Sequence, residues 1–345
     1  MWQVVGQTRA VSLLRTSLER KVVAHAYLFV GPHHVGKMTL ALNLAQALNC
    51  EAAEPPCGEC SSCQKIASAK HADVQIIGLA INGDSTEIKS RAEISIDQIR
   101  QMQHSASLPP FEGRYKVFII DGAEKLSSGA ANCLLKTLEE PASKVIFVLL
   151  TTNENLLPAT VISRCQRLEL SPLATTEVEA ALTSRGGMAT QRAKLLARLS
   201  RGRLGWALSA ALDDSLLQQR DERMQELLKI TDVDYEESFA YAAGLAAQFS
   251  QSREAVQEVL NMWRDWWRDL LLVKIGCNEA ITNVDLETPL VDSARGYQLA
   301  QIKTFINSIQ AAGEQLRQNA NPQLVLEMLM LNIPRKKEGV SINYG

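Results

Sequence analysis

The sequence predicts an α/β domain with a mainly parallel sheet, followed by two helical parts. Short apolar runs alternate with helical spacing over the first 170 residues, and no convincing buried strand follows Pro172. Aromatic residues make up only 5% of the 345 residues, which argues against a β-sandwich. Strands that alternate with amphipathic helices are typical of βαβ units, so we expect parallel pairing.

Four apolar runs have the length of buried strands, a last run at 166–170 could add a fifth strand, and three stretches between them have helical spacing. The expected strands are 27–30, 74–79, 117–120, 145–150 and 166–170, and the expected helices are 40–48, 96–102 and 130–139. Residues 1–170 therefore form the expected α/β domain. Glycines at 186, 187, 202 and 205 punctuate the next stretch, which predicts a small helical segment over 171–212 and a larger helical domain over 213–345.

One apolar stripe stands out in the larger helical domain. Trp263, Trp266, Trp267, Leu270 and Leu271 recur at i, i+3, i+4, i+7 and i+8. This spacing places them on one helix face, which predicts packing in a core or against another subunit. A cofactor-binding box is a weaker explanation of the same pattern.

Charge and hydropathy exclude two broad classes of protein. Lys and Arg total 36 against 38 Asp and Glu, a formal net charge of −2, so the chain as a whole is not a strongly basic nucleic-acid binder. A local basic face stays possible. No run approaches 18 consecutive apolar residues, and residues 1–20 lack the apolar region of a signal peptide. We therefore expect a cytoplasmic protein.

The motif after the first predicted strand is typical of a phosphate-binding loop. Residues 31–38 read GPHHVGKM, the G-x-x-x-x-G-K pattern between a strand and a helix. Gly31 and Gly36 let backbone N–H groups face a phosphate, and Lys37 adds positive charge. Met38 stands where Ser or Thr would bind Mg²⁺, and Thr39 lies about 100° further around the helix. A nucleotide site and a loop that folds without nucleotide both stay open.

Four of the seven cysteines fall within 14 residues. Cys50, Cys57, Cys60 and Cys63 have the spacing C-x6-C-x2-C-x2-C, which favours a metal site over disulfides in a chain without an export signal. Four thiolates form a closed structural Zn²⁺ site, here over about residues 50–66. Unliganded thiols and an iron–sulfur cluster are the alternatives. A stand-alone DNA-binding zinc ribbon is disfavoured, because residues 51–68 carry three glutamates and one lysine.

In this order and spacing the motifs resemble a known family. The P-loop, the cysteine insertion after its helix, LLKTLEEP at 134–141 and Ser-Arg-Cys at 163–165 are similar to the AAA+ clamp-loader subunits of bacterial DNA polymerase III. The resemblance covers the first 210 residues well, and NANPQLVLE at 319–327 resembles the family's collar domain less specifically. It implies a RecA-like AAA+ P-loop domain with an inserted zinc module, a small helical lid over 171–212 and a helical collar over 213–345.

The family contains ATP-hydrolysing gamma/tau subunits and delta-prime subunits, and the departures from the active pattern favour the delta-prime type. Active members have Asp-Glu after the third strand, with Asp on Mg²⁺ and Glu on the attacking water. Here Asp121 is followed by Gly122, and Glu124 comes two positions late. Gly205 stands where active lids carry an arginine. Together with Met38, these changes predict little ATP hydrolysis. An active gamma/tau-type ATPase is the alternative.

The resemblance also implies residue roles and partners. Gly31, Gly36, Lys37, Thr39 and Asp121 would form a degenerate site for ATP or ADP. Arg164 would act in trans as an arginine finger on a neighbouring gamma/tau subunit, unless it only caps a turn. The implied partners are gamma/tau and delta, and through the assembled loader the β clamp and primer–template DNA. The holoenzyme is a DNA-directed DNA polymerase, but no polymerase active site is expected in this chain.

Overall fold

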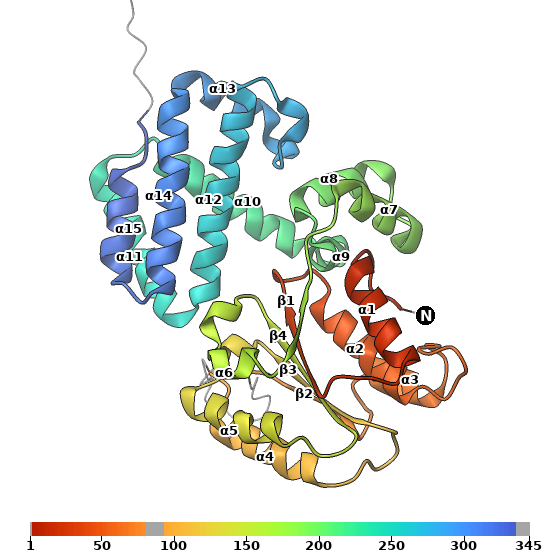
Figure 1. The fold of residues 1–345 in the computed structure, drawn as a ribbon. Helices are drawn as coiled ribbons and strands as arrows, with labels where there is room; N and C mark the ends of the chain where they lie inside the picture. The colour runs from red at the N-terminus through yellow and green to blue at the C-terminus, as the bar shows by residue number, and fades with distance from the viewer. Residues whose placement is uncertain (1, 80–92, 336–345) are drawn as a thin grey trace, which may run out of the picture. The chain divides into compact units, whose positions relative to one another are not determined.

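The computed structural model describes residues 2–79 and 93–335 (Figure 1). The chain consists of two compact units, one formed by residues 1–181 with 202–206 and the other by 182–201 with 207–345. Helices α7 (Thr175–Gly186) and α9 (Leu204–Leu212) each begin in the first unit and end in the second. The expected division into α/β domain, lid and collar stays a prediction.

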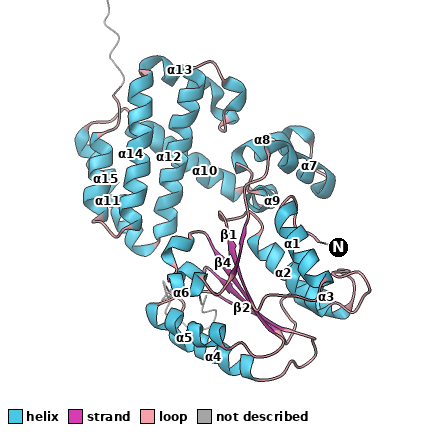
Figure 2. Cartoon of the chain, in the orientation of Figure 1, coloured by secondary structure: helices cyan, strands magenta, loops and turns pink. Residues whose placement is uncertain are grey.

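The first unit is built on a five-stranded sheet. Its strands are β1 (Ala26–Val30), β2 (Val74–Ile77), β3 (Lys116–Asp121), β4 (Val145–Thr151) and β5 (Gln166–Glu169). They lie in the order β2-β3-β4-β1-β5, and every pairing is parallel. The five predicted strands and the parallel sheet are confirmed. The central strands are buried along nearly their whole length, and mostly apolar, because helices cover both faces of the sheet (Figure 2).

Successive side chains of each strand point to opposite faces of the sheet, which divides the core of this unit into two layers. The helices are α1 (Thr8–Glu19), α2 (Lys37–Asn49), α3 (Ser61–Ala67), α4 (Ile96–Ser107), α5 (Ser128–Glu139) and α6 (Ala159–Ile162), with short 3₁₀ turns at Ala123–Lys125 and Glu154–Leu156. Phe29 of β1 packs in one layer with Leu40 and Leu44 of α2. Its neighbour Leu28 packs in the other layer with residues of α4 and α5.

Local signals in the sequence fix where the helices of the second layer begin. The Ser95 hydroxyl accepts a hydrogen bond from the N–H of Gln98, and the Gln98 side chain accepts one from the N–H of Ser95. This reciprocal pair satisfies N–H groups that the first turn of α4 leaves free. Ser127 is the N-cap residue of α5, and its hydroxyl accepts a hydrogen bond from the N–H of Ala130. Parallel strands and these helix starts place the loops after β1, β3 and β4 at one edge of the sheet, where α/β proteins bind ligands.

The second unit is helical, and the described residues after Thr175 contain no strand, as predicted. Its elements are α8 (Thr190–Ser200), α10 (Ser215–Ile230), α11 (Tyr235–Gln251), α12 (Arg253–Lys274), α13 (Glu287–Gly296), α14 (Leu299–Arg317) and α15 (Pro322–Leu331), with 3₁₀ turns at Asn278–Ala280 and Val284–Leu286. The tryptophans of the predicted stripe are buried on α12. The ring of Trp267 lies edge-on to Phe305 of α14, with centroids 4.8 Å apart. The stripe is therefore a core face.

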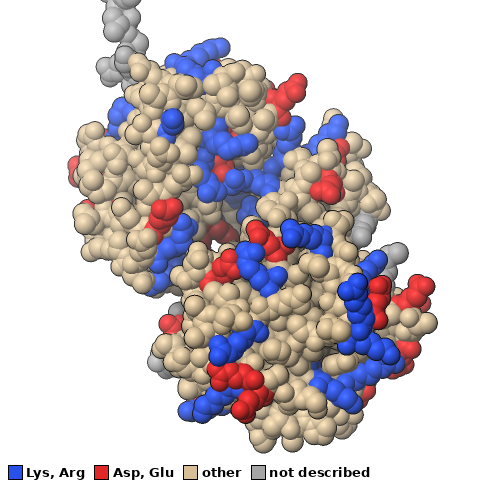
Figure 3. Space-filling view, viewed as in Figure 1, with Lys and Arg blue, Asp and Glu red and all other residues tan. Residues whose placement is uncertain are grey.

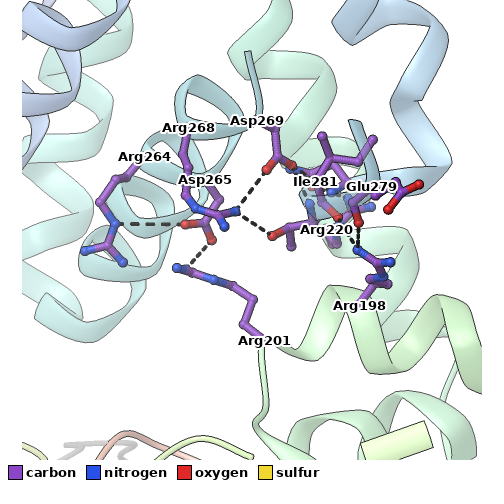
Figure 4. Close-up of polar contacts among 11 residues, drawn as sticks. Arg198, Arg201, Arg220, Arg264, Asp265, Arg268, Asp269, Glu279 and Ile281 are labelled. Atoms are coloured by element: carbon purple, nitrogen blue, oxygen red, sulfur yellow. Dashed lines mark hydrogen bonds and ion pairs between the residues drawn. The ribbon is translucent and has the colours of Figure 1, made fainter. Parts of the chain in front are cut away.

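Polar contacts join α8 to α12 and to the turns that follow it (Figure 4). Arg201, directly after α8, forms an ion pair with Asp265 of α12. Asp269, fully buried one turn further on, accepts from the backbone N–H groups of Thr282 and Asn283 at 2.9 and 2.8 Å. The ion pair of Arg201 joins α8 to α12 within one compact unit, and Asp269 holds the turns that follow α12. Among the described residues, no helix is long and apolar enough to cross a membrane.

Candidate functional sites

The candidate phosphate-binding loop joins β1 to α2 at the carboxyl edge of the sheet. The backbone N–H of Gly31 donates to the carbonyl of Thr151 at 3.1 Å, which ties the loop to the end of β4. A Cβ atom on residue 31 would lie 2.4 Å from the carbonyl oxygen of Leu170, so only glycine fits there. Met38, where a metal-binding hydroxyl would stand, packs instead against the apolar layer beneath α2.

Lys37 turns its ammonium group back onto the loop. Nζ donates to the carbonyl oxygens of Gly31 at 2.5 Å and Pro32 at 2.7 Å, and the residue is only 9% exposed. Burial lowers its pKa to about 8, while the negative charges of Glu124 and Asp121 act in the opposite direction. The structure therefore brings Gly31, Lys37 and Asp121 to one edge of the sheet, with the charge of the lysine held inside the loop.

Gly205, in the first turn of α9, rests directly on the tip of this loop. Its N–H donates to the carbonyl oxygen of His34 at 2.9 Å. A Cβ atom on residue 205 would lie 2.9 Å from that oxygen and 3.3 Å from both the Cα and Cβ of His34. A side chain at position 205 therefore requires the His34 loop or the first turn of α9 to move.

The chain after β3 has a backbone conformation that favours glycine. Gly122 has φ +75°, a backbone conformation that a glutamate at this position would adopt only with strain. Glu124 lies close by, and its Oε1 accepts from the N–H and the hydroxyl of Thr152 at 3.1 and 2.6 Å. The contact between Glu124 and Thr152 has no local sequence signal, because the two residues lie on different loops of the sheet edge.

The four clustered cysteines converge in space. Their sulfur atoms all lie within 4.8 Å of one another, and the Sγ atoms of Cys57 and Cys63 are 3.9 Å apart. A tetrahedral zinc site with Zn–S bonds of about 2.3 Å needs S–S separations of about 3.8 Å. Cys50 directly follows α2, and Cys60 and Cys63 lie at the start of α3. The donor set and its spacing therefore fit zinc.

Backbone N–H groups point at these sulfurs, as they do in thiolate metal sites. The N–H groups of Cys60 and Glu59 donate to the Cys57 sulfur at 3.3 and 3.4 Å, and lower the pKa of Cys57 to about 6. Burial instead raises the pKa of Cys63 to about 12. A bound cation would supply the charge that a buried Cys63 thiolate needs.

Arg164 follows α6 and contacts residues outside the P-loop. Its guanidinium donates to the Glu139 carboxylate at 2.7 Å and to the Thr160 carbonyl at 2.9 Å. Glu139 is the last residue of α5, within the LLKTLEEP segment. The side chain is 34% exposed, so both contacts lie at the surface. Next to it, burial raises the pKa of Cys165 to about 12, so that thiol is a poor nucleophile.

The comparisons with known proteins cover both units. Residues 6–174 match the family model "DNA polymerase III, delta subunit", and residues 214–335 match "DNA polymerase III, delta subunit, C terminal". Among solved structures, a DNA polymerase III gamma-subunit-related protein of Thermotoga maritima aligns over 92% of this chain and 97% of its own, at 19% identity and a TM-score of 0.42.

Two of the curated relatives come from Bacillus subtilis and are equally similar. The chain is 29% identical to subunit delta', and the alignment covers 94% of this chain and 95% of that relative. It is also 29% identical to subunit tau, and that alignment covers 96% of this chain but only 60% of the relative. Subunit tau of Escherichia coli is 36% identical over 60% of this chain, which spans 31% of that relative. With both family models matched in order, the chain belongs to the family of DNA polymerase III clamp-loader subunits.

Proposed function

We propose that this chain is a delta-prime-type subunit of the clamp loader, with little ATP hydrolysis of its own. The contact between Gly205 and His34 carries the proposal, because it leaves no space over the P-loop for the lid arginine of an active subunit. Electrostatic stabilisation of the transferring phosphoryl group is the main catalytic term in such enzymes. A site without that arginine therefore loses a large part of its rate.

Two more features of the same site support the proposal. The left-handed Gly122 stands where a glutamate would hold the attacking water, and Met38 offers no oxygen to Mg²⁺. Glu124 is the nearest replacement in the chain, but its carboxylate is bonded to Thr152. The P-loop residues, with Thr39 and Asp121, would then hold ATP or ADP without efficient turnover. Binding requires Lys37 to exchange two carbonyl partners for phosphate oxygens.

The chemical contribution of the subunit is Arg164, acting in trans. Its guanidinium lies at the surface, and it is bonded to Glu139 and Thr160 rather than to the chain's own P-loop. An exposed ion pair of this kind contributes only about 0–1 kcal/mol, so the side chain can leave Glu139 for a stronger anion. The γ-phosphate bound by a neighbouring gamma/tau subunit is such an anion, and the planar fork of arginine suits it.

The four cysteines hold one structural zinc ion in this proposal. Cys50, Cys57, Cys60 and Cys63 complete a tetrahedral shell and leave no open position for a substrate. The ion would stabilise the loop between α2 and α3 and take no part in catalysis.

The proposed partners are the gamma/tau and delta subunits, and through the assembled loader the β clamp and primer–template DNA. We expect the protein to act in the cytoplasm. The equal identity to tau and delta' of B. subtilis leaves an active gamma/tau-type ATPase as the second candidate. Hydrolysis by the chain alone discriminates between the two.

Reconstitution tests the proposal directly. The purified chain is mixed with gamma/tau and delta, and assembly is followed by size-exclusion chromatography with light scattering. We expect one loader assembly that contains this chain and loads the β clamp onto primed DNA. Assembly without this chain, at the same clamp-loading rate, would exclude the delta-prime role.

A further inference from the structure

The helical unit contains a polar hollow of about 240 Å³ between α12 and α14. Six polar side chains line it: Gln257, Asn261 and Arg264 from α12, and Gln310, Glu314 and Arg317 from α14. On each helix the three residues are spaced i, i+4 and i+7, so both rows face the same trough. Figure 3 shows Lys and Arg side chains exposed at several places on this unit.

A glycine keeps the trough open. Gly313 of α14 lies between the two rows, and a Cβ atom at this position would come within 3.3 Å of the Gln257 amide nitrogen. Glycine is an unfavourable residue in the middle of a helix, where alanine is favoured. The glycine lets the Gln257 side chain approach α14 closely.

The side chains that line the hollow form few polar contacts with the described part of the chain. None of the six side chains forms a hydrogen bond with another residue of the described ranges, 2–79 and 93–335. Arg264 turns only its Nε toward the Asp265 carboxylate, at 3.9 Å, and that carboxylate is already paired with Arg201 (Figure 4). The terminal nitrogens of Arg264 therefore remain available to a ligand.

The charges around the hollow are unbalanced. Arg201, Arg264 and Arg317 carry three positive charges, and Asp265 and Glu314 carry two negative ones. Burial lowers the pKa of Arg264, Asp265 opposes this, and the nearby charges of Arg201 and Arg317 lower it further. A bound anion would relieve this repulsion and accept hydrogen bonds from the guanidinium groups, which otherwise face water.

We propose that this hollow is a phosphate-binding site, with the guanidinium groups of Arg264 and Arg317 as its main ligands and the neighbouring amides as additional donors. Guanidinium binds phosphate through two parallel hydrogen bonds. The lining is too polar for the core of a protein–protein interface, which is depleted in charged residues, whereas nucleic-acid interfaces are polar and positively charged. The phosphate can belong to a nucleic-acid backbone or be a free ion.

Binding by the full chain tests this site. The probes are a fluorescein-labelled 20-nucleotide single strand and inorganic phosphate, the latter followed by ³¹P NMR. The variant is R264Q/R317Q. The control is R223Q/R295Q, which changes the net charge equally but removes arginines that already pair with Glu258 and Asp292.

We expect R264Q/R317Q to weaken binding of the single strand about tenfold and to reduce its log–log salt slope by about 1.4, since each lost phosphate contact contributes about 0.7. The control R223Q/R295Q should show less than half of this loss of affinity and less than half of this reduction in salt slope. Glu314→Gln removes a negative charge from the lining and should strengthen binding severalfold, which tests the site even if Arg264→Gln does not fold.

The remaining outcomes separate the ligand sources. Binding of inorganic phosphate alone, lost in R264Q/R317Q, supports a free-phosphate site. Equal loss in the variant and the control overturns the proposal, because the attraction is then a general effect of charge. If neither probe binds, and R264Q/R317Q instead fails to associate with partner subunits, the hollow receives an acidic side chain and the proposal is wrong.

Discussion

The backbone N–H of Gly205 donates to the carbonyl oxygen of His34 at 2.9 Å, so the first turn of α9 rests directly on the candidate phosphate-binding loop. His34 has φ +62°, a left-handed backbone conformation that residues other than glycine rarely adopt. A Cβ atom on residue 205 would lie 2.9 Å from that oxygen, so a side chain here requires the loop or the helix to shift. The glycine that the resemblance places at the position of a lid arginine is therefore also the residue that allows this close contact.

We expect the isolated chain to hydrolyse ATP at least about 10²–10³-fold more slowly than a gamma/tau subunit, because removing one transition-state donor already has an effect of that size. Phosphate release at saturating ATP measures the rate. Lys37→Ala should leave clamp loading by the reconstituted complex mostly intact. Turnover close to that of gamma/tau, abolished by Lys37→Ala, would show that this chain is an active ATPase.

The Gly205 contact also predicts that two glycine-to-alanine substitutions change the stability of the protein in opposite directions. Gly205→Ala places a methyl group 2.9 Å from the His34 oxygen and should lower the stability of the first unit by about 1–3 kcal/mol. Gly244→Ala, on the exposed side of α11 with no atom within 4 Å, should raise stability by about 0.5–1 kcal/mol. Urea unfolding followed by tryptophan fluorescence measures both. Equal effects of the two substitutions would mean that the close contact is absent.

Metal analysis of the purified chain should return close to one zinc per molecule. Cys60→Ser removes one of four ligands and should lower the zinc content and loosen the loop between α2 and α3. Cys277→Ser, at an exposed cysteine outside the cluster, is the matched control and should keep the zinc. A well-folded chain that contains no metal when prepared without chelator would refute the zinc assignment.

Asp73 should be a strong local stabiliser. Its carboxylate, on a residue that is 2% exposed, accepts from the N–H groups of Phe111, Glu112 and Gly113 at 2.8, 2.8 and 2.7 Å. Asp73→Asn should lower the free energy of unfolding at pH 7 by about 1–3 kcal/mol, because buried N–H groups lose a charged acceptor. Asp97→Asn, where the side chain is 73% exposed, should change it by less than about 0.5 kcal/mol.

The same carboxylate makes stability depend on pH. Burial opposes ionisation of Asp73, but the three N–H bonds outweigh it, and its pKa is lowered. A lowered pKa in the folded state contributes stability above the unfolded value of about 3.9, and this is lost as the pH falls toward the folded value. Below about pH 4 the difference between Asp73→Asn and the parent chain should therefore shrink. A constant difference from pH 7 to pH 3 would contradict this origin.

Patterns that are local in the sequence predicted most of the fold. Buried parallel strands read as continuous apolar runs, so residues such as Val145 and Leu150 marked β4 without further information. The cysteine spacing and the tryptophan stripe are equally local, and both groups converge in the structure.

The contacts that decide what the site can do could not be predicted in this way. Asp73 caps a loop 38 residues away, and Glu124 binds Thr152 across 28 residues. The family resemblance predicts an arginine at position 205 in active subunits, but nothing in the sequence predicts that the backbone of Gly205 lies on His34. Such contacts depend on how the elements pack, and no periodicity or spacing in the chain encodes them.

The central claim, that Arg164 serves a neighbouring ATPase, is tested most directly by ATP hydrolysis in an assembled loader whose gamma/tau subunits have their own arginine fingers replaced. Only the site facing Arg164 is then complete. Arg164→Ala should keep the zinc and the assembly but slow this hydrolysis by about 10³-fold or more, and Arg164→Lys should restore little of it because a point charge lacks the forked geometry. Arg100→Ala, at an exposed arginine on α4, is the control. Unchanged hydrolysis and clamp loading with Arg164→Ala would leave Arg164 with only its contacts to Glu139 and Thr160, and would contradict the proposed function.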